Sequence, residues 1–137
     1  PMSLASSIVE DAVAGRTVRI ERGGDQCDDY IYAVDAAEAI VAAALHPPPL
    51  KHRVYNIGSG RGTSLMDYAA LVKAAVPEAQ QEIGPGLDPM GFGVSYYSVF
   101  DCSRAAEFGF EPPDLRAGIH AFVAALRAQA RGAQGDR

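Results

Sequence analysis

The sequence contains no long hydrophobic run. None of its apolar stretches approaches the length of about 20 residues that a helix needs to cross a bilayer. The first residues also lack the basic start and the apolar block of a secretory signal peptide. We therefore expect no membrane partner and a cytoplasmic location.

Cysteine and histidine are both scarce. Cys27 and Cys102 lie far apart without a partner motif, a pattern typical of reduced cytoplasmic thiols. The three histidines, His46, His52 and His120, fit no metal-ligand spacing. We therefore expect no metal site.

An excess of positive charge is also missing. The formal net charge is −5, which argues against the basic surface of a nucleic-acid-binding protein. Apolar residues make up 48% and charged residues 21% of the sequence, as in ordinary soluble proteins. A chain of 137 residues is long enough for one domain with a substantial core.

Because Pro1 precedes Met2, we expect a piece of a longer chain, although a tag remnant would give the same start.

Residues 27–45 combine features that often mark a binding site. Residues 30–32 favour a short strand, and the alanine-rich segment that follows favours a helix. Asp35 is a good N-cap for this helix, and Glu38 can close a capping box with it. Carboxylates and tyrosines thus gather where a strand becomes a helix, a common place for a ligand in α/β proteins. The alternative is that the aspartates only cap and solvate the chain.

The rest of the sequence predicts short strands alternating with helices. Apolar residues at helical spacing predict helices over 3–14, 64–76 and 115–130, with a short one after Asp101 or Ser103. Strand patterns occur at 17–21, 28–31, 52–57 and 81–83, and residues 95–100 have a similar composition. The glycine- and proline-rich segment 84–94 predicts a mobile loop, of a kind that is usually functional or disordered.

The glycine loop 58–62 lies between a predicted strand and a helix, where backbone amides could hold a phosphate. Its spacing is not that of a dinucleotide-binding loop, because the third glycine would fall on Thr63. Glu82, about 20 residues on, could bind a ribose only if that loop held a cofactor. The pattern therefore favours a tight turn, with Ser64 as the cap of the next helix.

No nucleophile or acid–base pair stands out. The sequence has no G-x-S-x-G elbow and no serine next to a histidine. The tyrosines at 30, 32, 96 and 97 lack a lysine four residues later that could lower a phenol pKa. Packing with the hydroxyl at a water-facing edge is the favoured interpretation for each of them.

Three motifs, in order along the chain, resemble one enzyme family. The first motif consists of Asp29–Tyr32 and Asp35–Ile40, and the second of Val54–Gly60 and Thr63–Leu65. The third consists of Asp101–Ala105 and Gly109–Pro112. Leu115 and residues 118–119 then match the usual end of the family's pattern. These segments are similar to the C-terminal half of the extended short-chain dehydrogenase/reductases, the NAD-dependent epimerase/dehydratase family. The resemblance covers residues 3–126.

The resemblance implies an α/β fold, namely the C-terminal substrate-binding portion of such an enzyme, with short strands and four to five helices. It implies one domain over 1–131, with a strand at 53–58 that would join the Rossmann sheet, and a disordered tail at 132–137. The family's N-terminal nucleotide-binding half, with its cofactor loop and Tyr-x-x-x-Lys pair, is not present in this sequence. We therefore expect no catalytic residue on this chain.

The resemblance also implies which residues border the substrate. The expected substrate-binding residues are Asp29, Tyr30, Tyr32, Asn56, Gly58, Arg61 and Tyr97, and the 84–94 loop would lie over the ligand. Two arginines that contact the substrate diphosphate in the family are absent, and Asp28 stands at one of these positions. Since a diphosphate would lose its bidentate partners, we expect a sugar-type substrate other than a typical nucleotide-diphosphate sugar.

The implied function is the substrate-binding part of an NAD(P)-dependent sugar epimerase or dehydratase that is inactive alone. NAD or NADP would bind in the parent enzyme, with none expected on this chain by itself. The expected partners are a sugar-type substrate and either the missing N-terminal half or a second copy of this chain, as in a homo-oligomer. One alternative is a stand-alone, non-catalytic ligand-binding or dimerising module of the same fold, and another is a remnant that binds nothing.

Overall fold

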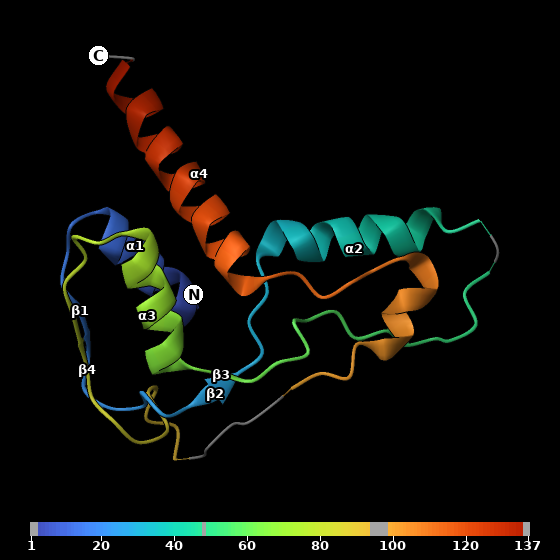
Figure 1. The fold of residues 1–137 in the computed structure, drawn as a ribbon, viewed down its shortest axis with the longest axis horizontal. Helices are drawn as coiled ribbons and strands as arrows, with labels where there is room; N and C mark the ends of the chain where they lie inside the picture. Colours follow the sequence, from blue (N-terminus) through green and yellow to red (C-terminus); the bar gives the residue numbers. More distant parts are fainter. Residues whose placement is uncertain (1–2, 48, 94–98, 136–137) are drawn as a thin grey trace.

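The computed structural model describes residues 3–47, 49–93 and 99–135. Its main body has three helices packed around a short parallel sheet, and a smaller group of elements extends to one side (Figure 1). The sequence-based prediction of an α/β fold with short strands and several helices is confirmed.

The first helix, α1 (Leu4–Val13), begins and ends where the sequence predicts. Ser3 is its N-cap, since the Ser3 hydroxyl accepts the N–H of Ser6 at 3.2 Å. Gly15 has a φ of 70°, a left-handed conformation that glycine adopts at low cost. The chain then turns from α1 into the first strand.

Two small sheets fix the path of the chain. β1 (Val18–Ile20) pairs in parallel with β4 (Gln81–Ile83), and α3 (Leu65–Ala75) lies between them in sequence. A parallel pair needs such a crossover, because a tight hairpin can only join antiparallel strands. β2 (Cys27–Asp28) pairs antiparallel with β3 (Thr63–Ser64), immediately before α3 begins.

The main core lies between α1, α3, α4 (Leu115–Gly135) and the β1–β4 sheet. Ser64 caps α3 as predicted, because its hydroxyl accepts the N–H of Asp67 at 3.0 Å. α4 contributes Ile119 and Val123 to the core, and it continues to Gly135, into the segment predicted as a tail. The largest fully buried side chains, each worth about 1.5–3 kcal/mol of hydrophobic stabilisation, are Ile8, Val9, Leu65, Val72 and Val76.

A second hydrophobic cluster lies under α2 (Ala33–Leu45), away from the main core (Figure 1). The short 3₁₀-helix η1 (Ser103–Phe108) forms its other side. We call this group the second cluster, and its buried members are Ala39, Cys102, Ala105, Phe108 and Phe110.

The start of α2 differs from the prediction. The helix begins at Ala33, and Tyr32 is its N-cap without a side-chain capping hydrogen bond. Asp35 is therefore a first-turn residue instead of the N-cap, and the capping box predicted with Glu38 is wrong. The physical reason is that Ala33 and Val34 already extend the helix toward the N-terminus.

The strands predicted at 28–31 and 52–57 also differ. The first is limited to Cys27–Asp28, because β3, its partner, has only two residues. Residues 53–58 form no strand in the described structure, since no other segment pairs with them. Their pairing with a Rossmann sheet therefore stays a prediction.

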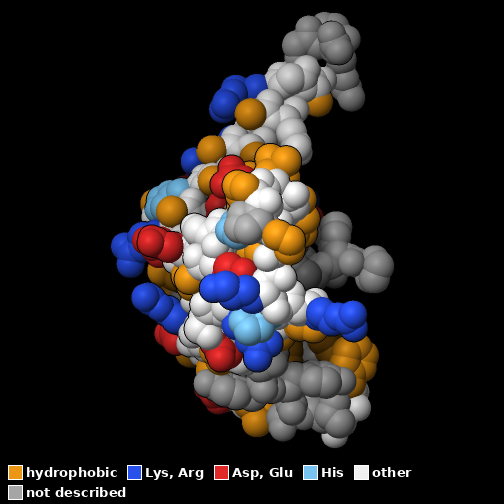
Figure 2. All heavy atoms as spheres, turned by 90° about the vertical axis from the view of Figure 1, so that its right-hand side faces the viewer, with side chains coloured by type: hydrophobic (Ala, Val, Ile, Leu, Met, Phe, Trp, Pro, Cys, Tyr) orange, Lys and Arg blue, Asp and Glu red, His pale blue; other side chains and the backbone are white. Residues whose placement is uncertain are grey.

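Charged side chains of both signs are interspersed on the face beyond the end of α2, where Lys and Arg alternate with Asp and Glu (Figure 2). Over the ranges that the structure describes, no helix combines the length and apolar character that a membrane span requires.

Candidate functional site

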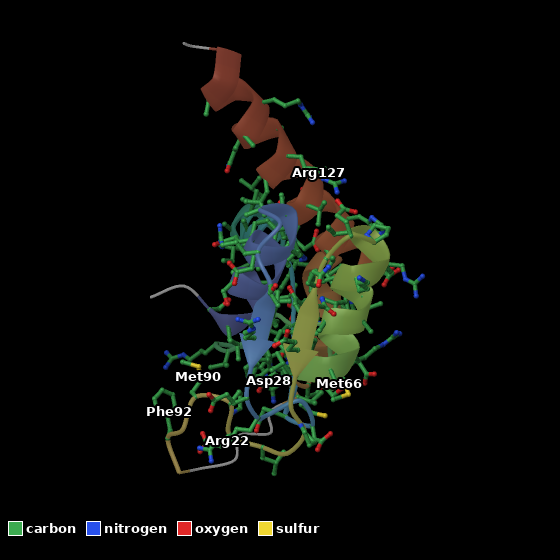
Figure 3. The ribbon with its side chains drawn as sticks, turned by 90° about the vertical axis from the view of Figure 1, so that its left-hand side faces the viewer. Arg22, Asp28, Met66, Met90, Phe92 and Arg127 are labelled. Atoms are coloured by element: carbon green, nitrogen blue, oxygen red, sulfur yellow. The ribbon has the colours of Figure 1, made fainter. Side chains whose placement is uncertain are left out.

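The candidate site is a cavity of about 440 Å³ between the segment 26–30, the start of α1 and the 88–92 part of the glycine-rich loop. Figure 3 shows Met90 and Phe92 on this loop, and Asp28, on the neighbouring segment, lines the same cavity. The polar and aromatic side chains that line the cavity are Ser3, Gln26, Asp28, Asp29, Tyr30, Asp88 and Phe92.

Asp88 organises the loop over the cavity. Its backbone has a φ of 59°, a left-handed conformation that Asp tolerates better than most residues. Its carboxylate accepts the N–H groups of Phe92 at 2.8 Å and of Gly93 at 2.9 Å, and the Arg22 guanidinium donates to it at 3.3 Å. These contacts, the Gly93 N–H first, hold the pKa of the Asp88 carboxyl below its ordinary value. The loop is thus folded around one anionic side chain.

Tyr30 and Asp28 form the polar wall opposite this loop. The Tyr30 hydroxyl donates to Asp28 Oδ2 at 3.5 Å, and the Tyr30 ring packs against Tyr68 with centroids 4.7 Å apart. Burial, reinforced by the Asp28 charge, raises the pKa of Tyr30 well above its ordinary value. Burial also raises the pKa of Asp28, partly offset by the Tyr30 hydrogen bond. The Tyr30 hydroxyl therefore stays protonated at neutral pH.

Gln26 connects the two sides of the cavity. Its side chain is only 3% exposed, and its Oε1 is 3.5 Å from the N–H of Asp88. Within the described ranges its Nε2 has no hydrogen-bond partner. The Oε1 contact is long, so it supports the loop only weakly, and the buried, unpaired amide donor is costly. Nothing in the sequence alone marks Gln26, because its role depends on a contact 62 residues away.

Asp29 holds the glycine loop in place. Its Oδ1 accepts both the N–H and the hydroxyl of Ser59, each at 2.6 Å. Its Oδ2 accepts the N–H of Gly60 at 3.0 Å and of Phe100 at 3.1 Å. The amides that could have bound a phosphate are therefore taken by an internal carboxylate. The loop does not fit the phosphates of a dinucleotide cofactor, which supports the tight-turn interpretation.

The other predicted substrate-binding residues lie in different places. Tyr32 lines an adjacent cavity of about 300 Å³, which shares Tyr30 with the main one. Asn56 donates through Nδ2 to the Asp101 carbonyl at 3.1 Å. Gly58 is buried against Asp29, and Arg61 borders a shallow hollow near Phe100.

The structure thus brings Asp29 and Tyr30 together at the cavity, with Tyr32 beside it. It does not bring Asn56, Gly58 and Arg61 there. Tyr97 lies outside the described residues.

The sequence did not single out Gln26, Met90 and Phe92 as site residues. For the latter two the only signal was the composition of the 84–94 loop, which was expected to lie over the ligand.

The cavity lining carries carboxylates and no described lysine or arginine. The nearest guanidinium on the loop side, Arg22, pairs with Asp88. Carboxylates, a phenol and an amide are suited to hydrogen bonds with hydroxyl groups. A diphosphate would instead need cationic partners at this surface. The site can therefore accept the hydroxyl groups of a neutral ligand and is poorly suited to a polyanion.

Comparison with known proteins relates the chain to sugar epimerases. Residues 1–58 match the model of the NAD dependent epimerase/dehydratase family. A UDP-glucose 4-epimerase of Cyamopsis tetragonoloba, GEPI48, is 32% identical over 78 residues, which are 56% of this chain and 22% of that protein. The chain therefore spans about a fifth of the length of this curated relative.

Solved structures share the fold over nearly the whole chain. The UDP-glucose 4-epimerase of Thermotoga maritima, solved with UDP-glucose, matches with a TM-score of 0.73 at 26% identity, over 93% of this chain and 40% of that one. The Bordetella bronchiseptica enzyme WbmF, solved with NADH, matches with a TM-score of 0.73 at 22% identity, over 97% of this chain and 39% of that one. Together with the family model over residues 1–58, these matches support the resemblance to the NAD-dependent epimerase/dehydratase family that the three motifs predicted.

Proposed function

We propose that this chain forms the substrate-binding side of an NAD(P)-dependent sugar epimerase or dehydratase, acting with a nucleotide-binding part outside these 137 residues. The observation that carries the proposal is the cavity bounded by Asp28, Tyr30 and Phe92. It lies under the loop that was expected to cover the substrate. The likeness to an epimerase solved with UDP-glucose supports a sugar-type ligand.

The ligand part that this cavity holds is an uncharged sugar. Asp28 accepts hydrogen bonds from sugar hydroxyls, the Tyr30 hydroxyl oxygen can accept another, and Phe92 gives an apolar surface for the face of the ring. The carboxylates disfavour a phosphate group in the same space, because like charges repel at short range. The role of the chain is to bind and orient, a contribution that can lower a barrier by several kcal/mol.

The nicotinamide cofactor belongs to the partner part in this proposal. On this chain the Ser59 and Gly60 amides are bound to Asp29, so they leave no free phosphate cradle. Because the chain also carries no Tyr-x-x-x-Lys pair, we expect that it turns over no substrate by itself. We expect the complete enzyme to be cytoplasmic and to form a homo-oligomer.

The test is a ligand titration of the isolated chain followed by saturation-transfer NMR. D-galactose and D-glucose should give transfer signals, and Phe92→Ala should remove most of them. Leu87→Ala, at a half-exposed side chain of the same loop, is the matched control and should keep them. Sugar signals that survive Phe92→Ala, or that never appear, would reject this site.

The second candidate is a stand-alone ligand-binding or dimerising module of the same fold. The observation that favours it is a main core that is complete within the described residues, with α1, α3 and α4 packed on one sheet. Both candidate functions predict that the isolated chain has no activity of its own. Incubating the chain with NAD and UDP-glucose tests this, because reduced cofactor or an epimerised product would contradict both candidates.

A further inference from the structure

A second cavity borders the cavity of the candidate site. Its volume is about 300 Å³, and it lies where the first turns of α1, α2 and α4 come together (Figure 1). The two cavities share Ser3, Ala5 and Tyr30 in their linings, so one ligand can extend from one into the other. We call the second one the aromatic cavity, because its lining includes Tyr30, Tyr32, Tyr68 and Phe122.

The described residues that line the aromatic cavity include no charged side chain. Two of its hydroxyl groups already bond to each other, since Ser3 Oγ and Ser6 Oγ are 2.8 Å apart. Most of the remaining wall is hydrocarbon, from residues such as Ile31, Leu115 and Ile119. A phosphate or a nucleobase would lose hydrogen bonds to water here without replacing them. The lining therefore favours an apolar occupant.

Close packing holds the aromatic wall in place. A Cβ on Gly118 would lie 2.8 Å from the Cβ of Tyr32, so the glycine lets α4 approach this tyrosine closely. The rings of Tyr32 and Phe122 have centroids 6.1 Å apart, and those of Tyr30 and Tyr68 are 4.7 Å apart. A ligand ring that enters the cavity does not have to order these side chains, which lowers the entropic cost of binding.

We propose that the aromatic cavity binds an uncharged aromatic group attached to the sugar, so that the substrate is an aryl glycoside. An apolar cavity of about 150 Å³ is large enough for benzene, and this one has about twice that volume. Aromatic side chains also pack well against a flat ring, in tilted or offset arrangements.

The lining of the sugar cavity is consistent with such a substrate. Its described residues include no lysine or arginine that could pair with a diphosphate on the sugar. A neutral ring attached to the sugar needs no such partner, and the neighbouring aromatic cavity offers it an apolar surface. The inference rests on the proposed function, and it adds the class of substrate that the two cavities take together.

The test titrates the ¹⁵N-labelled chain with methyl β-D-galactoside and, separately, with phenyl β-D-galactoside. The phenyl glycoside should bind about tenfold more tightly, because its ring moves from water into an apolar site. Only the phenyl glycoside should shift the amide signals of 31–33 and 118–122. Equal affinities of the two glycosides would overturn the proposal. An n-butyl glycoside that binds as tightly as the phenyl one would overturn the aromatic assignment.

A matched pair of variants locates the phenyl group. Ala33 and Ala37 are both exposed alanines of α2, and only Ala33 lines the aromatic cavity. Ala33→Trp should fill the cavity and reduce the affinity for the phenyl glycoside to that for the methyl glycoside. Ala37→Trp, one turn further on, should keep the tenfold preference. A preference that survives Ala33→Trp, or that Ala37→Trp removes equally, would overturn the proposal.

Failure here can be told apart from failure of the proposed function. The methyl glycoside reports on the sugar cavity alone, through the amides of 26–30 and 88–93. Binding of the methyl glycoside without a gain from the phenyl group would reject only the aromatic cavity. Phenyl-dependent shifts at 118–122 without any sugar-dependent shift at 26–30 would reject the sugar cavity, and binding of neither glycoside would reject both.

Discussion

Asp29 Oδ1 lies 2.6 Å from both the backbone nitrogen and the hydroxyl oxygen of Ser59. Thirty residues separate the two positions in the sequence. The other carboxylate oxygen of Asp29 binds Gly60 and Phe100, so this one side chain connects three segments. The glycine loop is consequently a structural turn, and the ligand cavity lies elsewhere, between Asp28 and Phe92.

Replacing Asp29 should destabilise the fold more than replacing its neighbour. Asp29→Asn weakens hydrogen bonds to several backbone amides, and we expect a loss of about 2 kcal/mol in the free energy of unfolding. Asp28→Asn is the matched control, because Asp28 makes only one long hydrogen bond, 3.5 Å, to Tyr30. Urea denaturation of the two variants measures the difference. Equal midpoints would contradict the anchoring role of Asp29.

Two glycine substitutions should have opposite signs. A Cβ on Gly58 would lie 2.9 Å from Asp29 Oδ2, so Gly58→Ala should destabilise the fold by about 1–3 kcal/mol through steric displacement of that carboxylate. Gly132→Ala, in α4 with no atom within 4 Å of the new Cβ, should stabilise the helix by up to about 1 kcal/mol. Thermal unfolding followed by circular dichroism checks both. A tolerated Gly58→Ala would show that Asp29 is not held rigidly.

The helix caps give a third prediction. Ser64→Ala removes the hydrogen bond to the Asp67 N–H and should cost about 1 kcal/mol. Asp35→Ala removes only a first-turn charge from α2, so its cost should be about 0.5 kcal/mol. Chemical denaturation of both variants tests the order of the two effects. A larger loss at Asp35 would restore it as the cap of α2.

Glu107 should make stability depend on acid pH. The Tyr55 hydroxyl donates to its carboxylate at 2.6 Å and the Lys51 N–H at 2.9 Å, and these bonds, the Tyr55 one first, lower the pKa of Glu107. A carboxyl with a lowered pKa in the folded state stabilises the fold above its ordinary pKa of about 4.3. That contribution is lost as the pH falls through the lowered pKa.

Glu107→Gln removes this contribution. The stability difference between the wild-type chain and the variant should therefore shrink between pH 6 and pH 3. Denaturation midpoints at both pH values measure it. A difference that stays constant would show that the Tyr55 and Lys51 contacts do not favour the ionised form.

Local patterns predicted much of the fold. The apolar spacing of residues 3–14 and the Ser64 cap depend on short-range chemistry, so α1 and α3 could be located from the sequence. The alternating pattern of 17–21 located β1, but its parallel pairing with β4 was not predicted, because it joins segments far apart in the sequence. The start of α2 was misplaced because Asp35 suits both an N-cap and a first-turn position.

The site could be predicted only in part. Tyr30 and the 84–94 loop were expected at the ligand, and the structure brings both to the cavity. The roles of Gln26 and Asp88 come from contacts across 62 and 66 residues, which no local pattern reveals. The strand character of 53–57 was visible in the sequence, but a strand forms only where a partner pairs with it.

The most direct test of the account is an NMR titration of the ¹⁵N-labelled chain with D-galactose and, separately, with NAD. D-galactose should shift the amide signals of residues 26–30 and 88–93, and NAD should leave those of Gly58–Gly62 unchanged. The reverse result, with NAD shifting Gly58–Gly62 and the sugar shifting nothing, would contradict a chain that binds sugar and leaves the cofactor to its partner.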